Sequence, residues 1–220
     1  SYLHNTRLLD DLGVRASDLL QSNCIIWVEG PSDRIYLNRW ISLWSDNALR
    51  EGDHYQCVFY GGSLLKHVSA SAENLDNAVS LIRANRKCVI LMDSDKPRKG
   101  FRIGDSKIRV RTEVRTTGGI DWVTSGRSIE NYLPASALAK MAGRTSVPQV
   151  KQFEDFAKYL EGLKPKLGHQ FSRSKVLFAE KVSQHLTQDE NSLILDLDKR
   201  MKLLCQYVEM CNETREGLIN

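Results

Sequence analysis

The sequence predicts an α/β protein with a mostly parallel sheet flanked by helices, and three observations support this fold class. Short apolar segments at residues 24–28, 55–60 and 88–92 are each bounded by polar or turn residues, as expected of strands buried on both faces. Helical patterns separate these segments, and strands that alternate with helices pair in parallel. An acidic motif follows both the first and the third segment, at residues 29–33 (EGPSD) and 93–95 (DSD).

The helices of the first half follow from apolar spacing and from turn residues. The first helix is expected over residues 33–44, where apolar side chains recur at helical spacing and Ser32 is the expected N-cap. A glycine pair, Gly61-Gly62, ends the second apolar segment. A second helix is expected over residues 73–84, leading into the third strand.

The second half of the chain changes to helices alone. After Pro134, helices are expected at residues 135–141, 150–163, 174–187 and 195–213, with Gly and Pro residues at the breaks 143–148 and 164–168. One helical face, formed by Val176, Leu177, Ala179, Val182 and Leu186, is expected to lie in the core. We therefore expect a helical lead-in at 1–22, an α/β core at 23–133 and a C-terminal helical subdomain at 134–220.

Bulk composition is that of an ordinary globular protein. The chain has 220 residues, of which 41% are hydrophobic and 26% charged, and no apolar run approaches the length of a membrane span. The polar start does not resemble a signal peptide, so we expect a cytoplasmic protein without a membrane partner. The five cysteines form no CxxC pair and are expected to be buried thiols.

Basic residues concentrate just after the second acidic motif, although the net charge is only +4. They are Lys96, Arg98, Lys99, Arg102, Lys107, Arg109, Arg111 and Arg115. This cluster is suited to a polyanion, and it is equally typical of a solvated loop and helix face.

The two acidic motifs predict a divalent-metal site. The carboxyl ends of parallel strands meet at one edge of a sheet, so Glu29, Asp33, Asp93 and Asp95 should converge there. In an extended backbone, Asp93 and Asp95 would point to the same side. Four converging carboxylates repel one another unless a cation holds them, and oxygen ligands suit Mg²⁺ or Mn²⁺. The competing interpretation is that the first motif caps a helix and the second forms a turn.

A third motif at residues 126–133 (GRSIENYL) extends this pattern. Together, the three motifs resemble the Toprim domain, in particular that of OLD-family (overcoming lysogenization defect) nucleases. The resemblance implies a Toprim-like fold and a two-metal site with Glu29, Asp33, Asp93 and Asp95 as the main ligands and Glu130 on the second metal. Ser94 or Ser128 could add an oxygen ligand.

The same resemblance implies a catalytic lysine beyond the last acidic motif. Lys175 is the best match, on a helix expected to begin at Ser172 or Ser174, and Lys181 is the alternative. Arg127 could contact a phosphate or pair with Glu130.

A metal-dependent DNA endonuclease of the OLD type is the function that the resemblance implies, with Glu29, Asp93, Glu130 and Lys175 as catalytic residues. The family usually carries an N-terminal ATPase domain, and this chain has no GxxxxGK[ST] loop, so we expect a C-terminal catalytic region that could form oligomers through a missing part. The alternatives are a topoisomerase or primase-like Toprim activity, a receiver-like Mg²⁺-binding phosphoacceptor, and an inactive scaffold. Tyr132 is expected to pack in the interior, not to act as a nucleophile.

Overall fold

The computed structural model describes residues 22–60 and 87–216. Most of the expected lead-in at 1–22, the glycine pair Gly61-Gly62 and the expected helix at 73–84 lie outside the described residues.

A parallel sheet forms the centre of the described structure. Its strands are β1 (Ile25–Val28), β2 (Gln56–Phe59), β3 (Cys88–Met92) and β4 (Ile120–Val123), arranged in the order β2-β1-β3-β4. Every neighbouring pair is parallel. The expected α/β class with a parallel sheet flanked by helices is therefore confirmed, and the three expected strands lie within one residue of their predicted limits.

Strand β4 was not among the expected strands. It contains only four residues, and the polar Asp121 interrupts its apolar pattern. Asp121 accepts hydrogen bonds from Arg111 and Arg115 of the helix α6 (Asp105–Thr116). An edge strand whose central carboxylate is satisfied by a neighbouring helix lacks the continuous apolar run that marks a buried strand.

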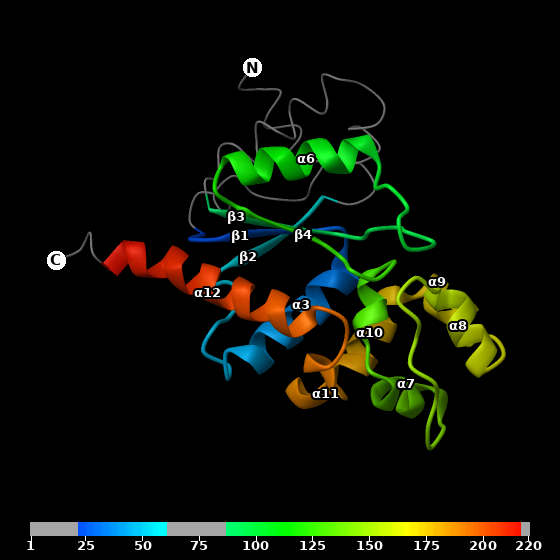
Figure 1. The fold of residues 1–220 in the computed structure, drawn as a ribbon. Helices are drawn as coiled ribbons and strands as arrows, with labels where there is room; N and C mark the ends of the chain where they lie inside the picture. Colours follow the sequence, from blue (N-terminus) through cyan, green and yellow to red (C-terminus); the bar gives the residue numbers. More distant parts are fainter. Residues whose placement is uncertain (1–21, 61–86, 217–220) are drawn as a thin grey trace.

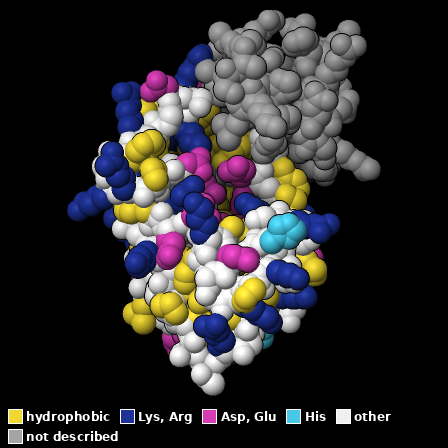
Figure 2. Space-filling view, turned by 90° about the vertical axis from the view of Figure 1, so that its right-hand side faces the viewer, with side chains coloured by type: hydrophobic (Ala, Val, Ile, Leu, Met, Phe, Trp, Pro, Cys, Tyr) yellow, Lys and Arg dark blue, Asp and Glu magenta, His cyan; other side chains and the backbone are white. Residues whose placement is uncertain are grey.

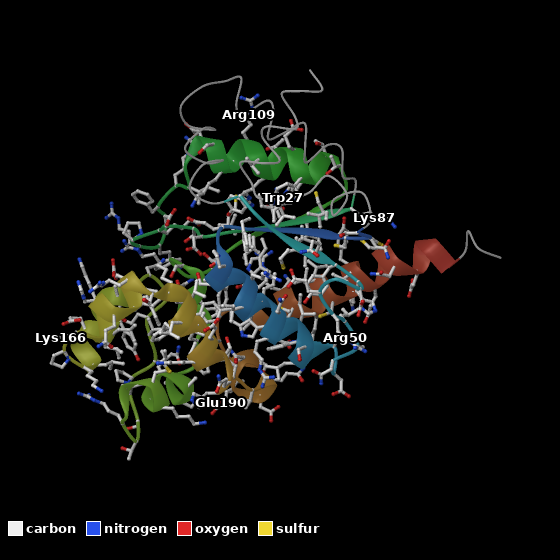
Figure 3. The ribbon with its side chains drawn as sticks, turned by 180° about the vertical axis from the view of Figure 1, so that it is seen from behind. Trp27, Arg50, Lys87, Arg109, Lys166 and Glu190 are labelled. Atoms are coloured by element: carbon white, nitrogen blue, oxygen red, sulfur yellow. The ribbon has the colours of Figure 1, made fainter. Side chains whose placement is uncertain are left out.

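Helices cover both faces of the sheet, as Figure 1 shows. Helix α6 lies on one face, and α3 (Pro31–Trp44) and α12 (Leu197–Glu216) lie on the other. Side chains alternate along β1, so Ile26 and Val28 join the core shared with α3 and α12, whereas Trp27 is buried outside that cluster. Figure 3 shows Trp27 in the interior beside the sheet and Lys166 at the periphery.

The second half of the described chain is helical, as expected. It contains the 3₁₀ helix η1 (Ile129–Tyr132), followed by α7 (Ala135–Ala142), α8 (Phe156–Leu163), α9 (Leu167–Arg173), α10 (Lys175–Ser183), α11 (Gln188–Ser192) and α12. Four differences stand out: α8 begins six residues later than the expected helix at 150, α9 begins inside the expected break at 164–168, α10 ends four residues before the expected limit at 187, and α11 was not expected. Phe156 of α8 packs edge-on against Phe171 of α9, with ring centroids 5.0 Å apart, so the two helices pack together across a short break.

One hydrophobic cluster joins the sheet to the helices that follow residue 134. Helix α10 packs on α3, and Phe178, Ala179 and Val182 are buried in this shared core. The expected core face of α10 is partly wrong, because Val176 and Leu177 are 39% and 49% exposed. Phe178, three residues after Lys175, takes the inward position instead. The division into an α/β core and a separate helical subdomain stays a prediction.

The cysteines and the length of the helices also bear on the sequence expectations. Cys24, Cys57, Cys88, Cys205 and Cys211 are free and buried, which confirms their assignment as buried thiols. No helix among the described residues is long and apolar enough to span a membrane.

Tyr132 ties the segment after β4 to the rest of the core. Its side chain is fully buried, and its hydroxyl accepts a hydrogen bond from the Ser125 backbone at 2.8 Å and donates one to Asp196 at 2.7 Å. Burial raises the pKa of Tyr132 above its ordinary value, so the phenol stays protonated. These contacts agree with a packing role for Tyr132.

We predict that Tyr132→Phe lowers the free energy of unfolding by about 1 to 3 kcal/mol, because it leaves the partly buried Ser125 backbone N–H without its acceptor and removes one of the bonds to Asp196, which keeps its ion pair with Arg200. Urea unfolding followed by circular dichroism measures this loss. Tyr159→Phe is the control: its hydroxyl donates one bond, to the Pro148 carbonyl, and its removal should cost less. Equal stability of Tyr132→Phe and the parent chain would contradict the prediction.

Candidate metal centre at the ends of the strands

Three neighbouring strands deliver carboxylates to one edge of the sheet. Glu29 directly follows β1, Asp93 directly follows β3, and Glu130 lies in η1, which follows β4. Because β1, β3 and β4 are adjacent and parallel, their carboxyl ends lie together. Figure 2 shows acidic side chains gathered in a hollow on one face, with lysine and arginine side chains around them.

The first turn of α3 holds the second acid of the first motif. The Gly30 backbone N–H donates to the Asp33 carboxylate at 2.9 Å, and α3 begins at Pro31 with Gly30 as its N-cap. The expected start at Asp33 with a Ser32 cap is therefore wrong by two residues. Pro31 suits the first helical position because a backbone N–H at that position has no partner within the helix, so the N–H that proline lacks is not missed. Asp33 consequently lies in the third helical position, where its carboxylate bends back toward Gly30.

Asp93 lies at the centre of the cluster. Its side chain is partly buried, and its carboxylate accepts a hydrogen bond from the Ile129 backbone N–H at 2.8 Å. This bond connects the end of β3 to the start of η1, so it fixes Asp93 relative to Glu130 in the next turn.

Asp95 does not continue the extended backbone that the sequence suggested. Its φ of +54° is left-handed, a conformation that Asp tolerates better than most residues. Its side chain is 72% exposed and forms an ion pair with Lys107, which also donates to the Asp93 carbonyl at 2.6 Å. The expectation that Asp93 and Asp95 share one side of an extended strand is therefore wrong, although Lys107 bridges the two residues.

The two serines considered as ligands are engaged in hydrogen bonds. The buried Ser94 hydroxyl donates to the Gly126 carbonyl at 2.5 Å, and its backbone N–H donates to the Thr124 hydroxyl at 2.8 Å. The Ser128 hydroxyl donates to the Glu130 carboxylate at 2.5 Å. In this structure Ser94 fastens the loop after β3 to the loop after β4, and Ser128 orients Glu130.

Glu130 is almost completely buried and has a cation beside it. Its side chain is 3% exposed, and the Lys175 ammonium lies 4.0 Å from its Oε1 atom. Lys175 is the first residue of α10 and is 54% exposed, so its ammonium also reaches solvent. Lys181 lines a different hollow with Met141 and Leu177. Of the two lysines considered, the structure brings Lys175 to the carboxylates.

Helix α10 begins close to the predicted position, since Ser174 is its N-cap. Arg127 pairs with Asp155 at 3.4 Å and not with Glu130, so one of its two expected partnerships is wrong.

Burial and mutual repulsion disfavour full ionisation of the cluster. Burial and then the charge of Glu130 raise the pKa of Asp33 to about 7. Burial, followed by the charges of Glu130 and Asp33, also raises the pKa of Asp93 well above its ordinary value. Glu29 is exposed at the rim, yet loss of surrounding water raises its pKa too, and Lys107 only partly offsets this rise. These directions are those of acids brought together without a cation.

The residues present fit a hydrated divalent ion. Mg²⁺ typically keeps several waters and takes only one or two carboxylates. Among residues 22–60 and 87–216, no group of three or more His, Cys, Asp or Glu side chains is arranged to hold one metal ion. The Tyr36 hydroxyl is buried without a hydrogen-bond partner in the described structure, and the charges of Glu130 and Asp33 act on it. An unpartnered hydroxyl near the acids suits a site whose remaining positions are filled by water.

Sequence reasoning missed the place of two residues in this cluster. Lys107 was counted only among the basic residues, yet its side chain is 12% exposed and pairs with Asp95. Tyr36 was read only as an apolar position of the first helix. No local spacing signals either role, because Lys107 arrives from α6 and the importance of the Tyr36 hydroxyl depends on Glu130, far along the chain.

Comparisons with known proteins show limited similarity. No family model and no curated protein sequence matches the chain. One similar solved structure is the C-terminal region of the OLD protein from Xanthomonas campestris pv. campestris, at 12% identity and a TM-score of 0.49, covering 88% of this chain and 98% of that one. Another is the C-terminal region of the Burkholderia pseudomallei OLD protein, at 15% identity and a TM-score of 0.48, covering 84% and 98% respectively. Both come from the family that the sequence motifs resemble.

We predict that Asp33→Asn stabilises the metal-free chain increasingly as the pH rises. The folded-state pKa of Asp33, about 7, lies above its unfolded value near 4, so the parent loses stability between those values as the unfolded state releases its proton first. Asn resembles protonated Asp and can still accept the Gly30 bond. The difference should grow by at most about 1.4 kcal/mol per pH unit across this window and then level off.

Thermal melts in EDTA from pH 4 to pH 8 measure this difference. Asp155→Asn, which changes a carboxylate paired with Arg127 outside the cluster, is the control and should not become more stable as the pH rises. A melting difference between Asp33→Asn and the parent that is independent of pH would contradict the assignment.

Proposed function

We propose that the chain is the catalytic region of a metal-dependent DNA endonuclease that hydrolyses phosphodiesters with two divalent ions, Mg²⁺ or Mn²⁺. The observation that carries the proposal is the position of Lys175 beside Glu130, within a cluster of carboxylates from the ends of β1, β3 and β4. A cluster of acids without a neighbouring cation would be compatible with any metal site. Acids with an exposed cation beside them can also receive a negatively charged phosphate.

Each residue has a role that follows from its contacts. Glu29, Asp33, Asp93 and Asp95 are the candidate ligands of one ion, and Glu130 is the candidate ligand of the second. As the side chains are placed in the described structure, one or two carboxylates would bind each ion directly and water would fill its other positions. The Ile129 amide orients the Asp93 carboxylate, and the Ser128 hydroxyl orients that of Glu130, as hydrogen-bond partners of metal ligands do. Bound divalent ions would supply the attacking water and stabilise the leaving oxygen.

Lys175 would stabilise the charge that develops on the phosphate. Its ammonium lies 5.4 Å from the centre of the Phe171 ring, and this contact with the preceding helix limits where the side chain can go. Because the ammonium is exposed on one side and faces Glu130 on the other, it lies between the cluster and solvent, where a substrate phosphate would enter.

No observation in the described structure favours the alternative functions. Tyr132 is not available as a topoisomerase nucleophile, because its hydroxyl is buried and hydrogen-bonded to Asp196. A receiver-like phosphoacceptor would take its lysine from a later strand of the sheet, whereas the lysine beside these acids comes from α10. We also propose, from the resemblance of the motifs alone, that this region acts together with an N-terminal ATPase domain.

We predict that the chain nicks supercoiled plasmid when Mg²⁺ or Mn²⁺ is added, and that Asp93→Ala and Lys175→Ala each lower the rate at least about 100-fold. Lys181→Ala is the matched control, because it removes the same charge from the same helix at a position outside the cluster. Gel electrophoresis of the plasmid forms over time measures the rate.

Three results would refute the proposal. They are nicking that persists in Asp93→Ala, plasmid ends covalently joined to the protein, which indicate topoisomerase chemistry, and no nicking by the parent chain with either metal.

We also predict that Mn²⁺ stabilises the chain against heat, independently of any cleavage. An ion that binds only the folded state adds about 2.7 kcal/mol at 100 times its Kd. The increment on adding Mn²⁺, compared with EDTA, should shrink in Asp93→Ala and in Glu130→Gln. Glu180→Gln on the exposed side of α10 is the control and should keep the full increment. Equal increments in all four proteins would exclude these acids as ligands.

A further inference from the structure

A hollow distinct from the one that Lys181 lines is found next to the carboxylates, at the carboxyl end of β4. It has a volume of about 320 Å³. The loop after β3 provides Lys96, Lys99 and Ile103, α6 provides Arg111, the end of β4 provides Thr124, and α12 provides Arg200. Its charged side chains are therefore all cationic.

The positive charge of this hollow is only partly neutralised. Arg111 shares the carboxylate of Asp121 with Arg115, so two guanidinium groups face one acid. Arg200 pairs with Asp196. Within the described part of the chain, no ion pair involves Lys96 or Lys99, which leaves both ammonium groups available to an anion.

The hollow is coupled to the candidate metal centre through Thr124. Thr124 lines the hollow, and its hydroxyl accepts a hydrogen bond from the backbone N–H of Ser94, which lies between Asp93 and Asp95. Lys96 follows directly on Asp95. A nucleic-acid strand with one phosphate at the carboxylates would therefore have this hollow within reach of a neighbouring phosphate.

The same loop carries an exposed aromatic side chain. Phe101 is 48% exposed, and its backbone N–H donates to the Arg98 carbonyl at 3.3 Å in a turn where Gly100 has a φ of +79°. The loop thus combines a large exposed ring with lysines and arginines. This is the combination used to bind single strands, in which cations follow the backbone and aromatic rings stack on bases.

We propose that this hollow and the loop at residues 96–103 form a subsite for an unpaired DNA strand. Lys96 and Lys99 bind a phosphate next to the one that is cut, and Phe101 stacks on an unpaired base. Stacking on a protein ring requires a base that has left the duplex stack, so the subsite favours a single-stranded segment over a duplex. The inference rests on the proposed function in that it takes DNA as the ligand.

The charge component is tested by binding without cleavage. Fluorescence anisotropy of a labelled single-stranded oligonucleotide in EDTA, at several salt concentrations, measures the affinity and its salt dependence. The double variant Lys96→Ala/Lys99→Ala should bind more weakly, and the slope of log K against log salt should become shallower by about 0.7, the value for one phosphate contact to a single strand. Lys140→Ala/Arg144→Ala is the matched control, which removes two exposed cations at the end of α7 and should leave affinity and slope unchanged.

The stacking component is tested on Phe101 alone. Phe101→Ala should lower the affinity for the single strand by about tenfold while leaving duplex binding unchanged, and Phe101→Trp should restore it. Because Phe101 is exposed, both variants should melt at the temperature of the parent chain, and melting curves verify this.

The outcomes separate this subsite from the proposed nuclease activity. Weaker binding in the variants supports the subsite even when the parent chain does not nick DNA. Metal-dependent nicking together with unchanged affinity and salt slope in Lys96→Ala/Lys99→Ala overturns the subsite and leaves the nuclease proposal intact. No single-strand binding by the parent chain, or an equal loss of duplex and single-strand binding in Phe101→Ala, also overturns it.

Discussion

The repulsion between carboxylates at the ends of three adjacent strands is the constraint on which this structure depends. Glu29, Asp93 and Glu130 meet because a parallel sheet brings strand ends together, and burial strengthens the repulsion by excluding water. The pKa values of Asp33 and Asp93 are raised first by burial and then by the charges of the neighbouring acids. Apolar or neutral side chains there would avoid this cost, and the cation that we propose would offset it.

Packing remote from the acids makes that arrangement rigid. Ser94 joins the loop after β3 to the loop after β4 by donating to the Gly126 carbonyl. A side chain at Gly126 would lie 2.6 Å from the Cβ atom of Asn131, so glycine is required where these two loops meet. Tyr132 then anchors η1 to Asp196 near α12. The helices after residue 134 thus do more than cover the sheet: they position η1, and α10 brings Lys175 to Glu130.

Features that are set by neighbouring residues in the sequence were mostly predicted correctly, whereas several that depend on contacts between distant parts of the chain were not. The strands at 24–28 and 88–92 were predictable because burial on both faces leaves a continuous apolar run. The convergence of Glu29 and Asp93 followed from sheet topology once the strands were known to be parallel. The prediction for Asp95 was wrong because tertiary contacts set its left-handed backbone. These contacts are the hydrogen bond from its backbone N–H to the Arg127 carbonyl and its ion pair with Lys107. The contribution of Lys107 depends on the docking of α6, which no local pattern reports.

The distribution of charge around the cluster also constrains how a polyanion could approach. A DNA phosphate brought to several carboxylates is repelled until cations compensate, and the chain supplies such cations from two separate elements. Lys175 comes from α10, and Lys96 and Lys99 come from the loop after β3. Lys107 forms an ion pair with Asp95, so it reduces the negative charge of the cluster and does not extend toward solvent. In the proposed site the acids would hold a divalent cation, while the surrounding lysines would attract the anion that this cation acts on, and neither group alone would complete the site.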